Sequence, residues 1–188
     1  MVMTRRAALM ISLACATVAA CGGNGSEANV PMGSLPRWEG ELRTLFDDEI
    51  NPVAVGLAMD GRSPAADPLL RLRAQSAEIA ARMRVQTVTR DTVGARTSYT
   101  LTLQIGMPPL LPLKLDVKTI DLIITPATGA FGIVQSIEAS MRGRTFIGFA
   151  HRFAGVEEPE LHWHLAADHA EVAQIVQEIS VLEELAGE

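Results

Sequence analysis

The sequence predicts an α+β domain over residues 37–188, built on an antiparallel β-sheet of about five to six strands with one face covered by N-terminal and C-terminal helices. Two observations lead to this fold class. Near both ends of the range, apolar residues recur at every third or fourth position, which is the helical period. Through its middle they alternate with polar residues, which is the strand period. No internal repeat is present in the sequence, so we expect a single domain.

The first helix is expected over residues 37–49. Asn51 and Pro52 should end it, because a residue that precedes proline is pushed out of the helical region. Its apolar face would consist of Trp38, Leu42, Leu45, Phe46 and Ile50. Asp67, followed by Pro68, has the pattern of a helix N-cap with proline in the first turn, and it predicts a second, short helix.

The last helix has the clearest helical pattern in the chain. Asp168 is predicted as its N-cap, and Glu171, three residues later, completes a capping box. The apolar face would consist of Val172, Ile175, Val176, Ile179, Leu182 and Leu185. Such a face can pack on the sheet or on a partner helix in a coiled coil. So short an apolar face favours packing on the sheet.

Two segments in the middle of the chain alternate strictly between apolar and polar residues. Residues 78–86 and residues 98–105 are therefore predicted as strands that pair in a hairpin through a turn at residues 91–96. A helix through residues 69–83 also fits the first of these segments, so the boundary between the second helix and the first strand stays open.

Further strands are expected at residues 116–125, 145–153 and 160–165. Residues 132–141 fit either a strand or a short helix. We favour a strand here, which would pair with residues 145–153 across a turn at Gly143. The predicted order is therefore helix, hairpins, helix.

The first twenty residues have the three parts of an export signal. Arg5 and Arg6 form a short basic start, residues 7–19 are apolar, and small residues precede Cys21. The apolar stretch is shorter than the roughly 20 residues that a bilayer-spanning helix needs. The ending, Val-Ala-Ala-Cys at residues 18–21, resembles the lipobox of bacterial lipoprotein signals, although that class usually has leucine where this chain has valine.

The resemblance implies that residues 1–20 are removed and that Cys21 becomes the first mature residue, with covalent acyl chains such as palmitate. Each buried methylene contributes about 0.8 kcal/mol, so several chains hold a protein on a membrane for long periods. For Gram-negative bacteria the class also implies the outer membrane, because Gly22 is not aspartate. Residues 21–36, rich in Gly, Ser, Asn and Pro, would then comprise the acylated cysteine and a flexible tether.

Charge and cysteine usage narrow the function classes. The net charge of the chain is −6, and removal of Arg5 and Arg6 leaves 14 basic residues against 22 acidic ones, a net charge of −8. An acidic chain without a basic tract is a poor ligand for nucleic acid, and charge alone would not draw it to an anionic lipid surface. Cys15 lies in the removed segment, so Cys21 would be the sole mature cysteine, which excludes an internal disulfide and thiol catalysis.

The four histidines are close together in the sequence: His151, His162, His164 and His169. Residues two apart on a strand face the same side, so His162 and His164 would project together, with His151 on a neighbouring strand. Neutral imidazole is a common ligand of zinc and copper, and Glu160 or Asp168 could complete such a metal site. A polar strand face in solvent explains the same pattern without a metal, and we favour it.

Residues 106–113, with the sequence GMPPLLPL, form an apolar loop that is too rich in proline for a central strand. If Leu110 and Leu111 are exposed, they make an apolar contact for a lipid, a membrane or a partner. If they are tucked in, they close one end of the core. We favour the tucked arrangement.

We expect a membrane-anchored, extracytoplasmic lipoprotein of the bacterial cell envelope whose domain is a binding or protein-interaction module rather than an enzyme. The sequence has no Gly-x-Ser-x-Gly elbow and no phosphate-binding glycine loop. The acidic groups at residues 47–49 and 157–158 lack EF-hand spacing and are expected to be solvated. The alternatives are a carrier of an apolar ligand or lipid and, third, a histidine-based metal-binding protein.

Overall fold

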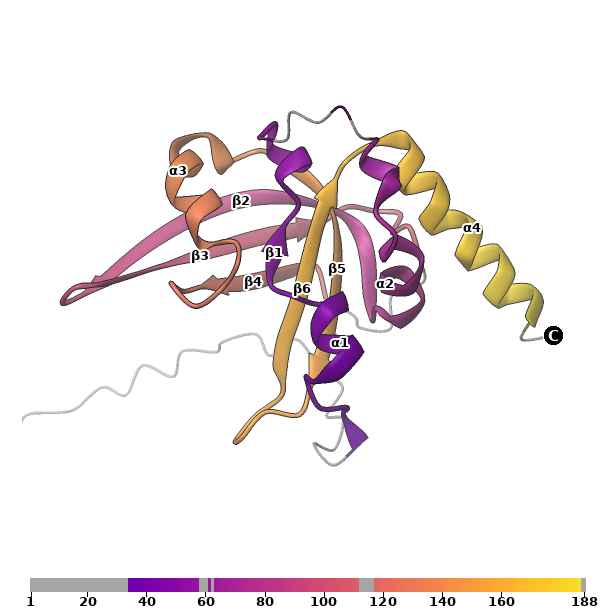
Figure 1. Cartoon of the computed structure of the whole chain (residues 1–188), viewed down its shortest axis with the longest axis horizontal. Helices are drawn as coiled ribbons and strands as arrows, with labels where there is room; N and C mark the ends of the chain where they lie inside the picture. The colour runs from indigo at the N-terminus through magenta and orange to yellow at the C-terminus, as the bar shows by residue number, and fades with distance from the viewer. Residues whose placement is uncertain (1–33, 58–60, 62, 112–116, 187–188) are drawn as a thin grey trace, which may run out of the picture.

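The structure, a computed structural model, describes residues 34–57, 61, 63–111 and 117–186. Within these residues one six-stranded sheet has the order β1-β6-β5-β2-β3-β4 (Figure 1). The strands are β1 (Glu49–Ile50), β2 (Ile79–Val93), β3 (Arg96–Ile105), β4 (Thr119–Ile124), β5 (Thr145–Phe153) and β6 (Glu160–Ala167). Neighbouring strands are antiparallel, except that β1 runs parallel to β6. The predicted α+β class is confirmed, with a sheet that is mixed because of this parallel pair.

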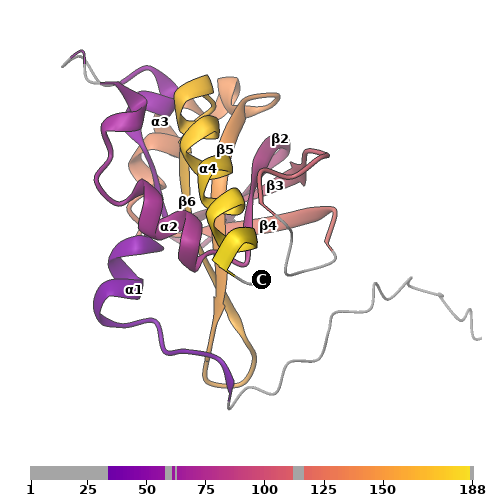
Figure 2. The same ribbon diagram turned by 90° about the vertical axis from the view of Figure 1, so that its right-hand side faces the viewer.

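The helices lie on both faces of this sheet. They are α1 (Gly40–Leu45), α2 (Leu70–Ser76), α3 (Phe131–Met141) and α4 (Ala170–Ala186), with two short 3₁₀ helices, η2 (Pro52–Val55) and η3 (Pro64–Ala66). As predicted, the N-terminal and C-terminal helices α1, α2 and α4 cover one face, over β5 and β6 (Figures 1 and 2). Helix α3 packs on the opposite face, against β2 and β3.

The strands predicted at residues 78–86, 98–105, 116–125, 145–153 and 160–165 correspond to β2 to β6. Strand β2 is longer than expected and continues to the two-residue turn at Gly94, whose φ of 62° suits glycine. The predicted pairing of the first two strands as a hairpin is confirmed.

Residues 132–141 belong to helix α3, so the strand favoured for this segment is wrong. Val134 and Met141 are buried, and Ile133 and Ile137 pack beside them against the core. These spacings fit the helical period, in which residues three and four apart share a face. A strand would have placed Ile133 and Val134 on opposite faces. Gly143, with a φ of 84°, still makes the turn into β5.

At the N-terminal end, the helix predicted over residues 37–49 is only six residues long. It ends at Leu45 because Asp48, with a φ of 54°, turns the chain into β1. The domain also begins earlier than residue 37, since the carbonyl of Pro36 accepts a hydrogen bond from the N–H of Ala154 (2.8 Å). The remainder of the predicted tether, residues 21–33, lies outside the described residues.

At the C-terminal end, the predicted capping box is not formed. Asp168 accepts a hydrogen bond from Arg82 Nε (2.9 Å), whereas the carbonyl of His169 accepts the first helical hydrogen bond, from the N–H of Ala173 (3.0 Å). Asp168 therefore pairs with a residue of β2 and does not cap α4. Leu182, predicted to be in the core, is exposed, because α4 extends past the elements on which it packs (Figure 1).

Two layers of buried side chains hold the helices on the sheet. Between the sheet and α3 the main residues are Ile79, Met83, Tyr99, Leu101, Leu103, Phe146, Trp163 and Leu165. On the other face, under α1, α2 and α4, they are Leu45, Phe46, Leu70, Ile147, Phe149, Phe153, Val172 and Val176. Each layer contains three buried aromatic side chains, a type that buries a large apolar area per residue.

The β2–β3–β4 half of the sheet has side chains exposed on the face opposite α3, and we call this surface the open face. Its residues are Arg84, Thr87, Thr89, Asp91, Val93, Arg96, Ser98, Thr100, Thr102, Gln104, Thr119, Asp121 and Ile123, all exposed or half-buried. A bulge between Val85 and Thr87 changes the phase of β2, so Arg84 and Val93 share this face.

Candidate functional site

The turn between α1 and β1 joins the N-terminal segment to β6 through Asp48. The backbone N–H of Asp48 donates to the carbonyl of Trp163 (2.9 Å), and the N–H of Trp163 donates back to Asp48 Oδ1 (3.1 Å). Three residues further along the chain, the N–H of Asn51 donates to the carbonyl of Leu165 (2.8 Å). Aspartate adopts positive φ more readily than most residues, which makes this tight exchange possible.

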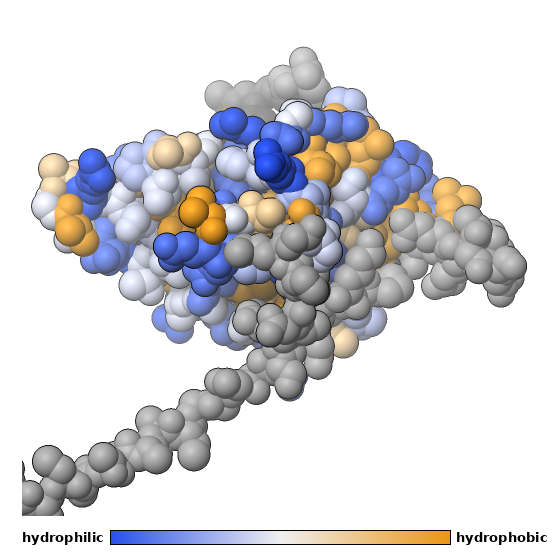
Figure 3. All heavy atoms as spheres, turned by 90° about the horizontal axis from the view of Figure 1, so that it is seen from below, coloured by the Kyte–Doolittle hydropathy of each residue, from blue (hydrophilic) through white to orange (hydrophobic). Residues whose placement is uncertain are grey.

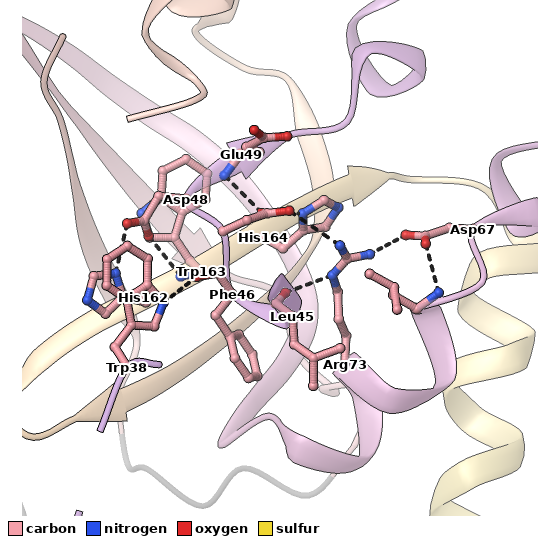
Figure 4. Close-up of polar contacts among 12 residues, drawn as sticks. Trp38, Leu45, Phe46, Asp48, Glu49, Asp67, Arg73, His162, Trp163 and His164 are labelled. Carbon is pink, nitrogen blue, oxygen red and sulfur yellow. Dashed lines mark hydrogen bonds and ion pairs between the residues drawn. The ribbon is translucent and has the colours of Figure 1, made fainter. Parts of the chain in front are cut away.

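Two buried histidines of β6 meet the two aspartates of this turn (Figure 4). His162 Nδ1 lies 2.8 Å from Asp48 Oδ2, and His164 Nδ1 lies 2.8 Å from Asp47 Oδ1. A carboxylate can only accept, so both imidazoles donate from Nδ1. The histidines share one face of β6, as predicted, but they are 9% and 5% exposed, so the predicted solvent-exposed face is wrong. Asp48 is likewise buried rather than solvated.

Arg73, on α2, adds a buried positive charge to this group. Its side chain is 4% exposed, and it donates from Nε to the carbonyl of Leu45 (2.7 Å). Its guanidinium pairs with Asp67 and, at 3.4 Å, with Asp47 Oδ2. A buried charge is tolerated only when it is paired and hydrogen-bonded. The side chains of Asp47, Asp48, Asp67, Arg73, His162 and His164, here called the Asp–His cluster, therefore tie α1, α2 and β6 together.

Trp38 closes the outer side of this cluster. Its indole stacks on the His162 ring with centroids 3.6 Å apart and an interplanar angle of 6°, and its Nε1–H donates to the carbonyl of Phe46 (2.7 Å). The edge of Phe153 contacts the same imidazole at 5.5 Å. Glu160 lies 3.6 Å from His162 Nε2. His162 is therefore enclosed by aromatic rings and carboxylates, with little room for a substrate.

The predicted metal ligands do not converge. His151 pairs with His162 in the β5–β6 register, but its ring contacts Phe46 and Phe153 at 5.5 and 4.9 Å. His162 and His164 form their hydrogen bonds with two different aspartates. Among the described residues, no group of three or more His, Cys, Asp or Glu side chains is arranged to hold a metal ion. Zinc or copper binding stays a prediction that this geometry does not favour.

The other predicted site residues are dispersed. Leu110 and Leu111 are buried against α2 and α4 residues, and both of their N–H groups lie 3.2 Å from the carbonyl of Ala80. The favoured tucked arrangement therefore agrees with the structure, and these leucines offer no apolar contact surface. His169 is exposed at the start of α4. Cys21 lies outside the described residues.

A second polar contact links β2 to β5. Arg152 holds Glu78 in a fork, with Nε to Oε2 at 3.0 Å and Nη2 to Oε1 at 3.1 Å, and its backbone N–H also donates to Oε2 (3.0 Å). Burial raises the pKa of the Glu78 carboxyl. The hydrogen bonds from Arg152 and the charges of Arg152 and His151 outweigh burial and leave this pKa below its ordinary value.

One further surface, at the end of the open face, was not predicted from the sequence. A hollow of about 480 Å³ is lined by Val93, Arg96, Thr97, Ser98, Thr125, Pro126 and Ala127, and we call it the hairpin groove. Val93 and, on β4, Ile123 are 73% and 66% exposed. Figure 3 shows apolar side chains at the end of the molecule formed by the hairpin. The one sequence feature that indicates this exposed apolar surface is the run Leu122 to Ile124, where an apolar residue interrupts the alternation of apolar and polar residues.

A second hollow, of about 510 Å³, lies beside the Asp–His cluster, lined by Trp38, Arg43, Asp47, Asp48, Glu49, Ala127, Thr128 and Gly129. Asp47 and Asp48 already form hydrogen bonds with His164 and His162, and Asp47 also pairs with Arg73, so these carboxylates are engaged within the protein. We therefore regard the Asp–His cluster as a device that holds the fold, and the open face as the candidate binding surface.

Comparison with known proteins gives no relative: no family model, no curated protein and no solved structure matches this chain. Among the described residues, no helix is both long enough and apolar enough to cross a membrane.

Asp48→Asn tests the Asp–His cluster. Asparagine also adopts positive φ, so the turn is retained while the negative charge that accepts from His162 and Trp163 is lost. We expect the free energy of unfolding to fall by about 1–3 kcal/mol. Urea unfolding at pH 7, followed by the fluorescence of Trp38 and Trp163, measures it. Asp91→Asn, at an exposed position of β2, is the control and should change the value by less than about 0.5 kcal/mol. Equal effects of the two substitutions would contradict the role of Asp48.

The lowered pKa of Glu78 predicts that the domain loses stability in acid. The folded pKa of this residue lies below the ordinary value of 4.5, so the ionised form is favoured by folding. This stabilisation is complete above the ordinary pKa and disappears as the pH falls through the lowered one. Glu78→Gln should therefore be less stable than wild type at pH 7.

Urea unfolding of both proteins between about pH 7 and pH 3 checks this, and the difference between them should shrink on the acid side. Glu158→Gln, at an exposed position, should follow wild type throughout. A difference for Glu78→Gln that stays constant with pH would show that the carboxylate charge is not the cause.

Proposed function

We propose that this chain is a membrane-anchored, extracytoplasmic lipoprotein whose domain is a protein-interaction module of the bacterial cell envelope. The lipobox-like ending at Cys21 and the basic and apolar segments before it support the anchor and an outer-membrane location. The free edge of β4 supports the interaction. This edge is the single observation on which the choice of an interaction module depends.

Strand β4 is the last strand in the sheet order, and no other strand among the described residues pairs with its outer edge. The N–H of Ile105 donates to the carbonyl of Lys118 (2.9 Å). Backbone groups alternate in direction along a strand, so those of Thr119, Asp121 and Ile123 point away from β3. An extended segment of another protein could pair with these groups, as in strand addition.

The side chains around this edge favour such a partner. Val93 and Ile123 are exposed apolar residues on the same face, and the hairpin groove beside them can take an apolar side chain from the added strand. Asp121 lies in the middle of the edge. A second copy of β4 paired about Asp121 would place two carboxylates opposite each other, which is unfavourable. The partner is therefore a different protein, with a basic residue opposite Asp121.

The alternative of an apolar-ligand carrier has less support. A carrier needs an enclosed apolar cavity, and the space between the sheet and α3 is filled by large side chains such as Tyr99, Phe146 and Trp163. The hairpin groove is an open hollow on the surface and does not enclose a ligand.

Labelled palmitate fed to the native cells tests the anchor. Wild type should incorporate the label, and Cys21→Ala should not, because the acyl chains are expected on Cys21. Cys15→Ala is a matched control, since Cys15 lies in the segment that would be removed, and it should be labelled like wild type. If wild type takes up no more label than Cys21→Ala, the lipoprotein proposal fails.

A photo-cross-linking residue in place of Val93 tests the interaction. Irradiated cells should give a discrete adduct with one envelope protein. Ile123→Pro should lower its yield at least about tenfold, because proline removes an N–H that points to the free edge and leaves the β3–β4 pairing intact. Ile123→Val keeps this N–H and should leave the yield unchanged.

The cross-linker placed instead at Val156, an exposed residue of the β5–β6 turn, is the control for random contact. Urea unfolding should show that Ile123→Pro is folded. Equal yields from Ile123→Pro and Ile123→Val, or the same adduct from position 156, would refute strand addition at β4.

A further inference from the structure

The open face has a second hollow, at the end away from the hairpin turn. It has a volume of about 290 Å³ and is lined by Arg82, Arg84, Gln104, Ile105, Gly106, Met107 and Thr145, and we call it the Arg84 hollow. In the register of the sheet, Thr145, Arg84 and Gln104 are opposite one another on β5, β2 and β3. Their side chains therefore form one row across the open face.

The two arginines of the hollow differ in their surroundings. Arg82 is paired with Asp168 at 2.9 Å, so its charge is balanced. Arg84 is exposed, and none of the described residues forms an ion pair with it or accepts a hydrogen bond from it. Among the described residues, nothing compensates the charge of Arg84, in a chain whose net charge is −6.

The turn before β5 lies next to Arg84. The N–H of Gly143 donates to the carbonyl of Val85 (2.8 Å), and the N–H of Val85 donates to the carbonyl of Arg144 (2.9 Å). A Cβ atom built on Gly143 would lie 3.8 Å from Arg84 Nη2. The Arg84 guanidinium thus extends toward this turn, whereas the Arg144 side chain donates from Nε to the carbonyl of Ser140 on α3 (3.0 Å), on the opposite face of the sheet.

Neutral donors complete the row. Gln86 donates from Nε2 to Gln104 Oε1 (3.1 Å), so the amide N–H groups of Gln104 are left to donate to a ligand. The hydroxyl of Thr145 is a further donor. Met107, at the rim, is 78% exposed and offers an apolar contact next to the charge. The planar fork of arginine matches the geometry of phosphate oxygens, to which it donates two parallel hydrogen bonds.

We propose that the Arg84 hollow binds a phosphate group, with Arg84 as the bidentate donor and Gln104 and Thr145 as neutral donors. The ligand class is a phosphate ester such as the headgroup of an anionic phospholipid, or free phosphate. This site goes beyond the interaction at β4 and does not depend on it or on the anchor. It gives an acidic protein one local surface that attracts anions.

The test uses the full chain labelled with ¹⁵N in micelles of a neutral detergent. Inorganic phosphate is added in one series, and phosphatidylglycerol is introduced into the micelles in another, with phosphatidylcholine as the neutral lipid. The side-chain amide signal of Gln104 should shift and saturate. Arg84→Gln should weaken the affinity at least about tenfold, because it removes both the charge and the fork.

Arg90→Gln is the matched control. Arg90 is an exposed arginine on the same strand, but it lies opposite Tyr99 and so on the other face of the sheet, and its loss should leave the affinity unchanged. Arg84→Lys keeps the charge without the fork and should fall between Arg84→Gln and wild type. It also serves as the second variant if Arg84→Gln does not fold.

The pattern of binding identifies the source of the phosphate. Saturation with phosphatidylglycerol alone assigns a lipid headgroup, saturation with phosphate alone assigns a soluble ligand, and saturation with both assigns the shared phosphate group. The proposal is overturned if neither saturates, if sodium chloride at equal ionic strength gives the same shift, or if Arg90→Gln weakens binding as much as Arg84→Gln.

Discussion

The reversal of the chain at Asp48 is the constraint on which the N-terminal half of the structure depends. A positive φ at this position lets Asp48 exchange hydrogen bonds with Trp163 while its carboxylate also reaches His162. The adjacent Asp47 then meets His164 and Arg73. Removing one partner from such a buried group leaves a charge or donor unsatisfied, which costs more than the intact pairing contributes. The cluster therefore specifies one position of α1 and α2 on the sheet.

The two halves of the sheet differ in which of their faces are buried. Strands β5 and β6 have helices on one face and core side chains on the other, so both of their faces are buried. Strands β2, β3 and β4 extend beyond this body and expose one face (Figure 1). Substitutions at exposed positions usually change stability little, so the open face can vary in sequence without loss of the fold. Residues that hold the fold and residues available for binding are thus separate.

Much of the sheet could be predicted, because its strands alternate in a way that needs no knowledge of the partners. Helix α3 could not be assigned, since Ile133 and Ile137 share a face in a strand as well as in a helix, and packing against β2 and β3 decides between the two. For the Asp–His cluster, the alternation of apolar and polar residues in β6 correctly predicted that His162 and His164 share one face of the strand. It could not show that this face is buried, because the aspartates they meet lie 114 and 117 residues earlier in the chain.

The bulge in β2 has a consequence for how the chain length can vary. Arg84 and Val93 are nine positions apart, an odd number that would put them on opposite faces of a regular strand. The extra residue at Gln86 brings them to the same face. Loss of that one residue would turn every side chain from Thr87 to the hairpin tip over to the other face, or shift β2 against β3. Length changes at the tip leave this phase intact, so we expect insertions and deletions to disturb the fold less there than at Gln86.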